Sequence, residues 1–185
     1  MAEIIIEKYA DLVYKICMTK LYNFDRASVA DACQNVFLNY LRYKRRFKDE
    51  THERAWFIRT AINCCTDIYR KNKRRFESEE SGDISEFNNI SAGDNFEDPG
   101  GELYEMLELL PEKIRYAVYL YYIEEYSTEE IAEILKTSGA SVRMRLKRGR
   151  EILRERLDGI AGQARNDLSG GLIIDNSNER SVLDV

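Results

Sequence analysis

Apolar residues recur every three or four positions along most of this chain, which is the period of an amphipathic α-helix. Three apolar stripes with this spacing fall within the first 76 residues. They are formed by Tyr9, Leu12, Val13, Ile16, Cys17, Met18 and Leu21; by Val29, Cys33, Val36, Phe37, Tyr40 and Leu41; and by Ile58, Ile62, Cys65 and Tyr69. Three helices with complementary stripes can bury one small core, so we expect a helical domain at residues 1–76.

A second helical pattern occupies residues 103–157. Its stripes are formed by Leu107, Leu110, Ile114, Ala117, Val118 and Tyr121; by Ile131, Ile134 and Leu135; and by Val142, Leu146 and Leu153. We therefore expect an all-α fold with two small helical domains. The glycine-containing segment 158–185 is expected to be a flexible or weakly docked tail of unknown role.

The segment 77–102 between the two patterns has the composition of a flexible linker. It is rich in Ser, Gly and Asn, and it carries nine acidic residues and no Lys or Arg. Residues 1–76 carry 16 Lys and Arg against 9 Asp and Glu, and residues 103–157 carry ten of each kind. The net charge of −5 is therefore an average over unlike segments, and it does not exclude nucleic acid as a partner.

The sequence points away from a membrane, a metal site and a catalytic centre. No stretch approaches the ~18 apolar residues of a membrane span, and the N-terminus has no signal-peptide pattern, so we expect a cytoplasmic protein. Cys17, Cys33, Cys64 and Cys65 lack the paired spacing of zinc ligands; we expect small buried residues, with a thiol sensor as the alternative. The single histidine, His52, is expected in a loop and has no convergent partners. The sequence predicts no enzyme and no cofactor.

Residues 127–153 have the pattern of a helix-turn-helix. Ser127 can cap a short helix, and Glu130, three residues later, can complete a capping box. We expect Gly139 to supply the turn, with either Ser138 or Ser141 capping the second helix. The second helix of such a pair enters the major groove of DNA.

The second of these helices, in "SGASVRMRLKRGREIL", sorts its residues onto two faces. Val142, Leu146, Gly149 and Leu153 fall on one face and can pack inward, and no acidic residue interrupts positions 142–150. The basic residues fall on the other face, where arginine can contact guanine edges and lysine can neutralise phosphate. The residues predicted to contact DNA are Arg143, Met144, Lys147, Arg148 and Arg150; the alternative is an ordinary solvated basic surface.

The same stretch resembles a known family when read with the segments around it. "LPEKIRYAVYLYYIEEYSTEEIAEILKTSGASVRMRLKRGREIL" is similar to region 4 of the extracytoplasmic-function (ECF) sigma factors, which belong to the sigma-70 family of bacterial RNA polymerase subunits. "DACQNVFLNYL" and "ERAWFIRTAINCCTDIYRKNKRR" resemble two helices of the family's region 2. The order of these matches, on both sides of a linker, is that of the family.

The resemblance implies a promoter-specificity subunit without catalysis of its own. It would bind core RNA polymerase, recognise the −35 and −10 promoter elements, and support promoter melting. An anti-sigma factor is a further implied partner, and no membrane insertion is implied. The acidic linker is then either a plain spacer or a mimic of nucleic acid within the polymerase. A stand-alone helix-turn-helix regulator is the alternative function, and a small enzyme is a third reading that no motif supports.

The resemblance also assigns residues to three surfaces. The helix in region 4 that carries Arg143 would read the −35 element; there Gly149 replaces a usual alanine, which should loosen the helix by up to ~1 kcal/mol. Trp56, near the −10 surface, is either a core residue or a stacking platform for an extruded base. The resemblance places polymerase contacts at Asp31, Gln34, Asn35 and Leu38, with Val36 and Phe37 in the core, and −10 contacts at Arg59, Asn63, Asp67, Arg70 and Lys71.

Overall fold

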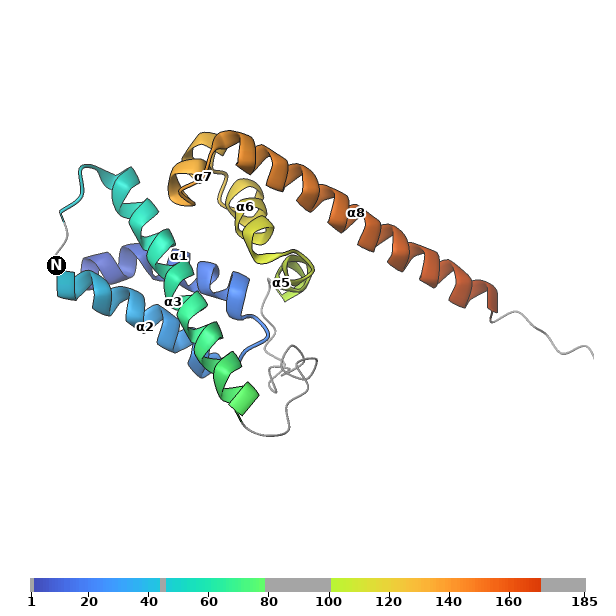
Figure 1. Cartoon of the computed structure of the whole chain (residues 1–185), viewed down its shortest axis with the longest axis horizontal. Coiled ribbons are helices and arrows are strands. Elements are labelled where there is room, and N and C mark those ends of the chain that lie inside the picture. Colours follow the sequence, from blue (N-terminus) through green and yellow to red (C-terminus); the bar gives the residue numbers. More distant parts are fainter. Residues whose placement is uncertain (1, 44–45, 79–100, 171–185) are drawn as a thin grey trace, which may run out of the picture.

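The computed structural model describes residues 2–43, 46–78 and 101–170, with side chains described within 3–43, 46–74 and 101–159. The described chain is helical and contains no strand, which confirms the predicted all-α fold (Figure 1). Its helices are α1 (Ala2–Leu21), α2 (Arg26–Tyr43), α3 (Glu50–Ser78), α5 (Gly101–Glu108), α6 (Glu112–Tyr122), α7 (Thr128–Ile134) and α8 (Gly139–Gly170).

Helices α1, α2 and α3 pack against one another around one core (Figure 1). Each of the three predicted stripes contributes buried side chains to it, including Ile16, Val36 and Ile58, all with no exposed surface. Phe57 lies at an aromatic centre, where its ring stacks on Tyr9 with centroids 4.2 Å apart. Large aromatic rings bury about 150–250 Å² each, so this cluster contributes much of the apolar surface that the small bundle removes from water.

Helices α6, α7 and α8 form the second group, and α5 leads into it. Its core contains Leu110, Leu120, Ile131 and Val142. The expected continuous stripe from 107 to 121 is wrong in one respect: the helix breaks before Pro111, which is the N-cap residue of α6. Proline lacks the N–H that a continuous helix would need there, so α5 and α6 point in different directions. Tyr121, placed on the stripe, is 38% exposed.

Gly149 lies where α8 crosses α6. A Cβ atom at this position would meet Cγ2 of Val118 at 2.6 Å and Cγ2 of Ile114 at 3.1 Å. Glycine therefore allows the two helices to approach closely, a packing role that comes in addition to the loosening of the helix expected from the sequence.

Helix α8 continues to Gly170, thirteen residues beyond the predicted end of the helical pattern at 157. The segment contains no proline, and a glycine such as Gly159 costs only ~1 kcal/mol in a helix interior. Nothing lies within 4 Å of a Cβ built on Gly159, and Leu157 is 52% exposed, so this part of α8 stands clear of the core (Figure 1). Residues 79–100 of the predicted linker and 171–185 of the predicted tail lie outside the described residues.

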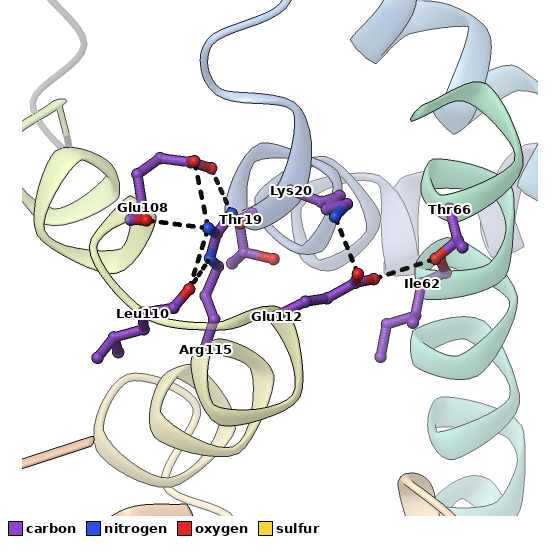
Figure 2. Close-up of polar contacts among 8 residues, drawn as sticks. All are labelled: Thr19, Lys20, Ile62, Thr66, Glu108, Leu110, Glu112 and Arg115. Carbon is purple, nitrogen blue, oxygen red and sulfur yellow. Dashed lines mark hydrogen bonds and ion pairs between the residues drawn. The ribbon is translucent and has the colours of Figure 1, made fainter. Parts of the chain in front are cut away.

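The two helical groups are in contact: α5 and α6 pack on α1, and α7 packs on α3. Arg115, only 7% exposed, lies at the centre of this junction (Figure 2). Its guanidinium donates to the carbonyl oxygen of Thr19 at 3.0 Å and to that of Leu110 at 3.1 Å, and it pairs with the carboxylate of Glu108. Thr19 is one of the last four residues of α1, whose carbonyls have no partner within the helix. The side chain of Arg115, from helix α6, thus caps the end of α1.

Candidate nucleic-acid interface

The helix-turn-helix is formed by α7 and α8, and α7 begins with the predicted capping box. The backbone N–H of Glu130 donates to Oγ of Ser127 at 3.3 Å, and the N–H of Ser127 donates to Oε2 of Glu130 at 2.9 Å. The hydroxyl of Ser127 also donates to Oε2 of Glu130 at 2.7 Å, and this bond, together with the one from the Ser127 N–H, holds the pKa of the Glu130 carboxyl below its usual range. The capping box is confirmed, and it fixes where α7 starts relative to α6.

The turn between α7 and α8 differs from the prediction. Lys136 has a positive φ of 49°, whereas Gly139 has no positive φ and is the first residue of α8. Lysine in this left-handed conformation costs more than glycine would, so the packing of α7 on α8 imposes the turn. Ser138, not Ser141, caps α8, because its Oγ accepts the N–H of Ser141 at 3.2 Å.

Helix α8 presents its basic side chains to solvent as the spacing predicts. Val142 and Leu146 are 0% and 4% exposed and face the core, while Met144 on the opposite side is 65% exposed. Among the described residues, the ion pairs on this face are long: Arg143 with Glu129 at 3.7 Å and Lys147 with Glu151 at 3.9 Å. The side chains exposed together are Arg143, Met144, Lys147, Arg148 and Arg150, with Arg150 donating to the hydroxyl of Tyr122 at 3.1 Å.

The predicted −10 residues lie along one side of α3, but they differ in accessibility. Asn63, Asp67, Arg70 and Lys71 are exposed. Arg59 is half-buried, since its Nη1 donates to the carbonyl oxygen of Glu133 in α7 at 3.2 Å. The structure therefore brings the start of this surface against the helix-turn-helix, a contact between positions 74 apart that no local pattern indicates.

A cleft of about 630 Å³ separates this part of α3 from the end of α7. Trp56, Arg59 and Asn63 line it from α3, and Leu135 and Lys136, which follow α7, line it from the other side. Trp56 is half-buried and packs on Phe57 and Phe47, with ring centroids 5.1 Å and 5.8 Å apart. Trp56 thus packs against the core and also lines the cleft, and its role as a stacking platform stays a prediction.

Sequence reasoning missed Arg54 as a residue of this surface. Its Nη2 lies 3.3 Å from Oε2 of Glu124, and its guanidinium lies over the ring of Tyr126, 5.6 Å from the centroid. Glu124 is 11% exposed and also accepts a hydrogen bond from the hydroxyl of Tyr119 at 3.0 Å. The acidic "IEEY" after α6 was the available signal, but only the tertiary fold shows which arginine it meets.

The predicted polymerase surface lies on the outward side of α2. Asp31, Gln34 and Asn35 are exposed, and Leu38 is 47% exposed, although leucine is normally buried. Val36 is fully buried and Phe37 packs against Phe57, with ring centroids 5.8 Å apart, which confirms that both belong to the core. The remaining exposed apolar side chains at the end of α2 are Leu41 and Tyr43.

The structure corrects the placement of His52 and sorts the cysteines by burial. His52 lies in the first turn of α3, not in a loop, because Asp49 caps the helix by accepting the N–H of His52 at 2.9 Å. Cys17 and Cys65 are buried, whereas Cys33 and Cys64 are half-buried. Burial raises the pKa of Cys64 to about 11, so this thiol stays protonated at neutral pH. The thiol-sensor alternative is untested.

Two further features of the described residues bear on function. Within residues 2–43, 46–78 and 101–170, no cluster of His, Cys, Asp and Glu is arranged to hold a metal ion. None of the helices in these segments combines the length and the apolar character needed to cross a membrane.

Comparison with known proteins identifies both helical groups. The model of Sigma-70 region 2 matches residues 5–75, and that of Sigma-70 region 4 matches residues 100–153. The ECF RNA polymerase sigma factor SigW of Bacillus subtilis is 29% identical over 164 residues, covering 83% of this chain and 87% of SigW. SigZ of the same organism is 30% identical, covering 73% of this chain and 76% of SigZ.

A solved structure has a similar fold. It is the sigma factor RpoE in complex with the anti-sigma factor NepR from Bartonella quintana, with a TM-score of 0.66 at 15% sequence identity. The match covers 84% of this chain and 96% of RpoE. At this identity the likeness shows the fold alone.

Proposed function

This chain belongs to the ECF sigma factors of the sigma-70 family, which direct RNA polymerase to promoters, and we propose which of its surfaces select those promoters. Sigma factors are non-enzymatic subunits, so selection depends on binding alone. Residues 1–76 would act as the region 2 domain, 103–157 as the region 4 domain, and 77–102 as the connection between them. The site of action is the bacterial cytoplasm, where the polymerase transcribes.

Helix α8 reads the −35 element. The observation that carries this assignment is the exposure of five neighbouring side chains on the second helix of a helix-turn-helix, four of them cationic. Arg143 and Lys147, one turn apart, can reach base edges, and Arg148 and Arg150 can neutralise phosphates. Met144 supplies an apolar surface suited to a thymine methyl group. Each bidentate contact of this kind contributes ~1–3 kcal/mol of discrimination.

Helix α3 reads the −10 element and assists melting. Asn63, Asp67 and Arg70 offer donors and acceptors along one side, and Lys71 adds a phosphate contact. Extruding a base from the duplex costs a few kcal/mol, which contacts in a pocket and stacking on an aromatic ring can offset. Trp56, with Thr60 and Asn63 of α3 lining the same cleft, offers the aromatic ring and the polar groups that such a base requires.

The outward side of α2 binds core RNA polymerase through Asp31, Gln34, Asn35 and Leu38. Leu38 shares α2 with the exposed Leu41 and Tyr43, and exposed apolar side chains that gather on one part of a surface mark interaction sites. An anti-sigma factor is a further proposed partner, since the structurally similar RpoE is bound to one.

Transcription by reconstituted polymerase tests these surfaces. Core polymerase with the wild-type chain should initiate at discrete sites on genomic fragments, and the sequences upstream would define the two elements. Arg143→Ala and Lys147→Ala should then reduce initiation tenfold or more at those promoters. Base changes near −35 that reduce initiation by the wild-type chain should cause no further reduction with these variants. Arg154→Ala, an exposed substitution two turns further along α8, is the matched control. Unchanged initiation in the first two variants would refute the assignment of α8.

A further inference from the structure

The guanidinium of Arg143 lies over the start of α8, beside a carboxylate of α7 and a glycine. Its Nη1 is 3.7 Å from Oε1 of Glu129, and it lies 3.3 Å from the position that a Cβ on Gly139 would take. We propose that Glu129 positions Arg143 and thereby determines the preference of this arginine for guanine in the −35 element. This role rests on the proposed function, because it assumes that α8 reads that element.

Glu129 is itself held in place at the start of α7. The hydroxyl of Thr128 donates to both of its carboxylate oxygens at 2.9 Å. Glu129 lies in the first turn of the helix, where the helix dipole favours a negative charge. The neighbouring Glu130 is engaged in the capping box with Ser127, so Glu129 is the acid of this turn that pairs with α8.

Gly139 provides the space that this arrangement needs. Its φ is not positive, so the turn before α8 does not require glycine at this position, although alanine is the better helix former. A Cβ added to Gly139 would lie 3.3 Å from Nη1 of Arg143 and 3.8 Å from Oε1 of Glu129. The first of these distances is shorter than an ordinary van der Waals contact, so a side chain here would displace the guanidinium. The glycine and the acid thus both define where the guanidinium lies.

A guanidinium held through Nη1 keeps the donors that guanine requires. Arginine has five N–H donors in a planar fork, and guanine presents O6 and N7 as acceptors in the major groove. With Nη1 directed to Glu129, Nη2 and Nε remain for these two atoms. An arginine that is already positioned loses less conformational freedom on binding, and it is less able to turn towards a phosphate. The position of Arg143 therefore favours guanine over the other bases.

The carboxylate of Glu129 has the opposite effect on the general affinity for DNA. A negative charge beside the basic face repels phosphates, so Glu129 should weaken binding to every duplex. In the free chain the pair is weak, because the side chains of Arg143 and Glu129 are 61% and 75% exposed. DNA that covers α8 displaces water and strengthens the pair when the base is read. Arg150 has a neutral partner instead, the hydroxyl of Tyr122 at 3.1 Å, which suits a residue that meets phosphate.

Initiation on altered promoters tests the role of Glu129. Holoenzyme is reconstituted from core polymerase and each variant, and discrimination is the ratio of initiation on a promoter found with the wild-type chain to initiation on a copy with one base change near −35. Arg143→Ala first identifies the base pair at which this arginine discriminates. Glu129→Ala should reduce discrimination at that base pair about fivefold, and should raise binding to a duplex without promoter elements about twofold. In the Arg143→Ala background, Glu129→Ala should no longer change discrimination.

Gly139→Ala tests the same position without a change of charge. The added methyl group should displace the guanidinium and lower discrimination at the same base pair about twofold, while thermal unfolding shows a chain at least as stable as the wild type. Glu133→Ala, an exposed substitution one turn along α7, matches the charge change of Glu129→Ala and should leave discrimination unchanged.

The outcomes separate the failure of this role from the failure of the proposed function. Wild-type discrimination in Glu129→Ala, or an equal loss at every base pair, would overturn the positioning role while leaving the sigma function intact. An Arg143→Ala variant with unaltered base preference would overturn the reading of bases by Arg143, and the role of Glu129 with it. A wild-type chain that cannot direct core polymerase to any start site would overturn the proposed function itself.

Discussion

Replacing Gly149 by alanine should destabilise the protein, although alanine is the better helix former. In an exposed helix interior, Gly→Ala stabilises by about 1 kcal/mol. At position 149 the new methyl group would lie 2.6 Å from Cγ2 of Val118 and 3.1 Å from Cγ2 of Ile114. Both neighbours are β-branched and buried, so neither can rotate away cheaply. Overpacking of this kind costs ~1–3 kcal/mol, and we expect a net loss of about 1–2 kcal/mol.

Urea unfolding followed by circular dichroism measures this change. Gly149→Ala should lower the midpoint without a change in slope. Gly159→Ala, on the same helix with no atom within 4 Å of the added Cβ, is the matched control and should raise stability by up to about 1 kcal/mol. The double variant Gly149→Ala with Val118→Ala should lose less free energy of unfolding than the sum of the losses of the two single variants, because Val118→Ala removes the clashing methyl group. If Gly149→Ala stabilises the protein as much as Gly159→Ala, the close approach of α6 and α8 is refuted.

Three other substitutions give independent checks. Ser127→Ala should cost about 1 kcal/mol of stability in thermal unfolding, because it leaves N–H groups at the start of α7 without a partner; an unchanged midpoint would contradict the cap. The pKa of Glu130 is lower in the folded chain than its ordinary value of 4.5, so the capping box contributes fully above that pH and is lost as pH falls through the folded pKa. Glu130→Gln should therefore remove part of the acid-induced loss of stability seen in urea titrations from pH 6 to 3, and an identical pH profile would argue against this linkage. Arg148→Ala should weaken −35 duplex binding and reduce the slope of log K against log salt by about one, as expected for one lost phosphate contact; a loss of affinity with the full slope retained would assign Arg148 to base edges instead.

The helices and their inward faces could be predicted from the sequence because apolar spacing records which side of a helix is buried. Ile16, Val36 and Val142 lie where that spacing placed them. The capping box at Ser127 could also be predicted, since it depends on two side chains three residues apart. The exposed basic face of α8 followed from the same spacing.

The failures have physical causes that a local pattern does not contain. The turn before α8 uses Lys136 in a left-handed conformation, because packing of α7 on α8 outweighs the preference for glycine. From the sequence, Gly149 is a weak point in a helix. Its effect on the stability of the protein nevertheless depends on its close approach to Val118, a residue on another helix. The helix beyond 157 persisted because glycine is only mildly unfavourable in helices.

The contact between the two domains was the largest feature beyond the reach of the sequence. Lys20 and Glu112 are 92 positions apart, and Arg54 and Glu124 are 70 apart. A charged residue on a helix surface has many possible partners, and periodicity does not choose among them. The role of Arg115 as a cap on α1 likewise requires the three-dimensional arrangement (Figure 2).

The most direct test of the central claim is whether the purified chain binds bacterial core RNA polymerase and directs it to specific promoters. We expect the chain to co-elute with core polymerase in gel filtration and to produce transcripts with discrete 5′ ends on genomic DNA, each preceded by a shared pair of elements. A chain that binds duplex DNA by itself but neither associates with core polymerase nor directs initiation would contradict the account.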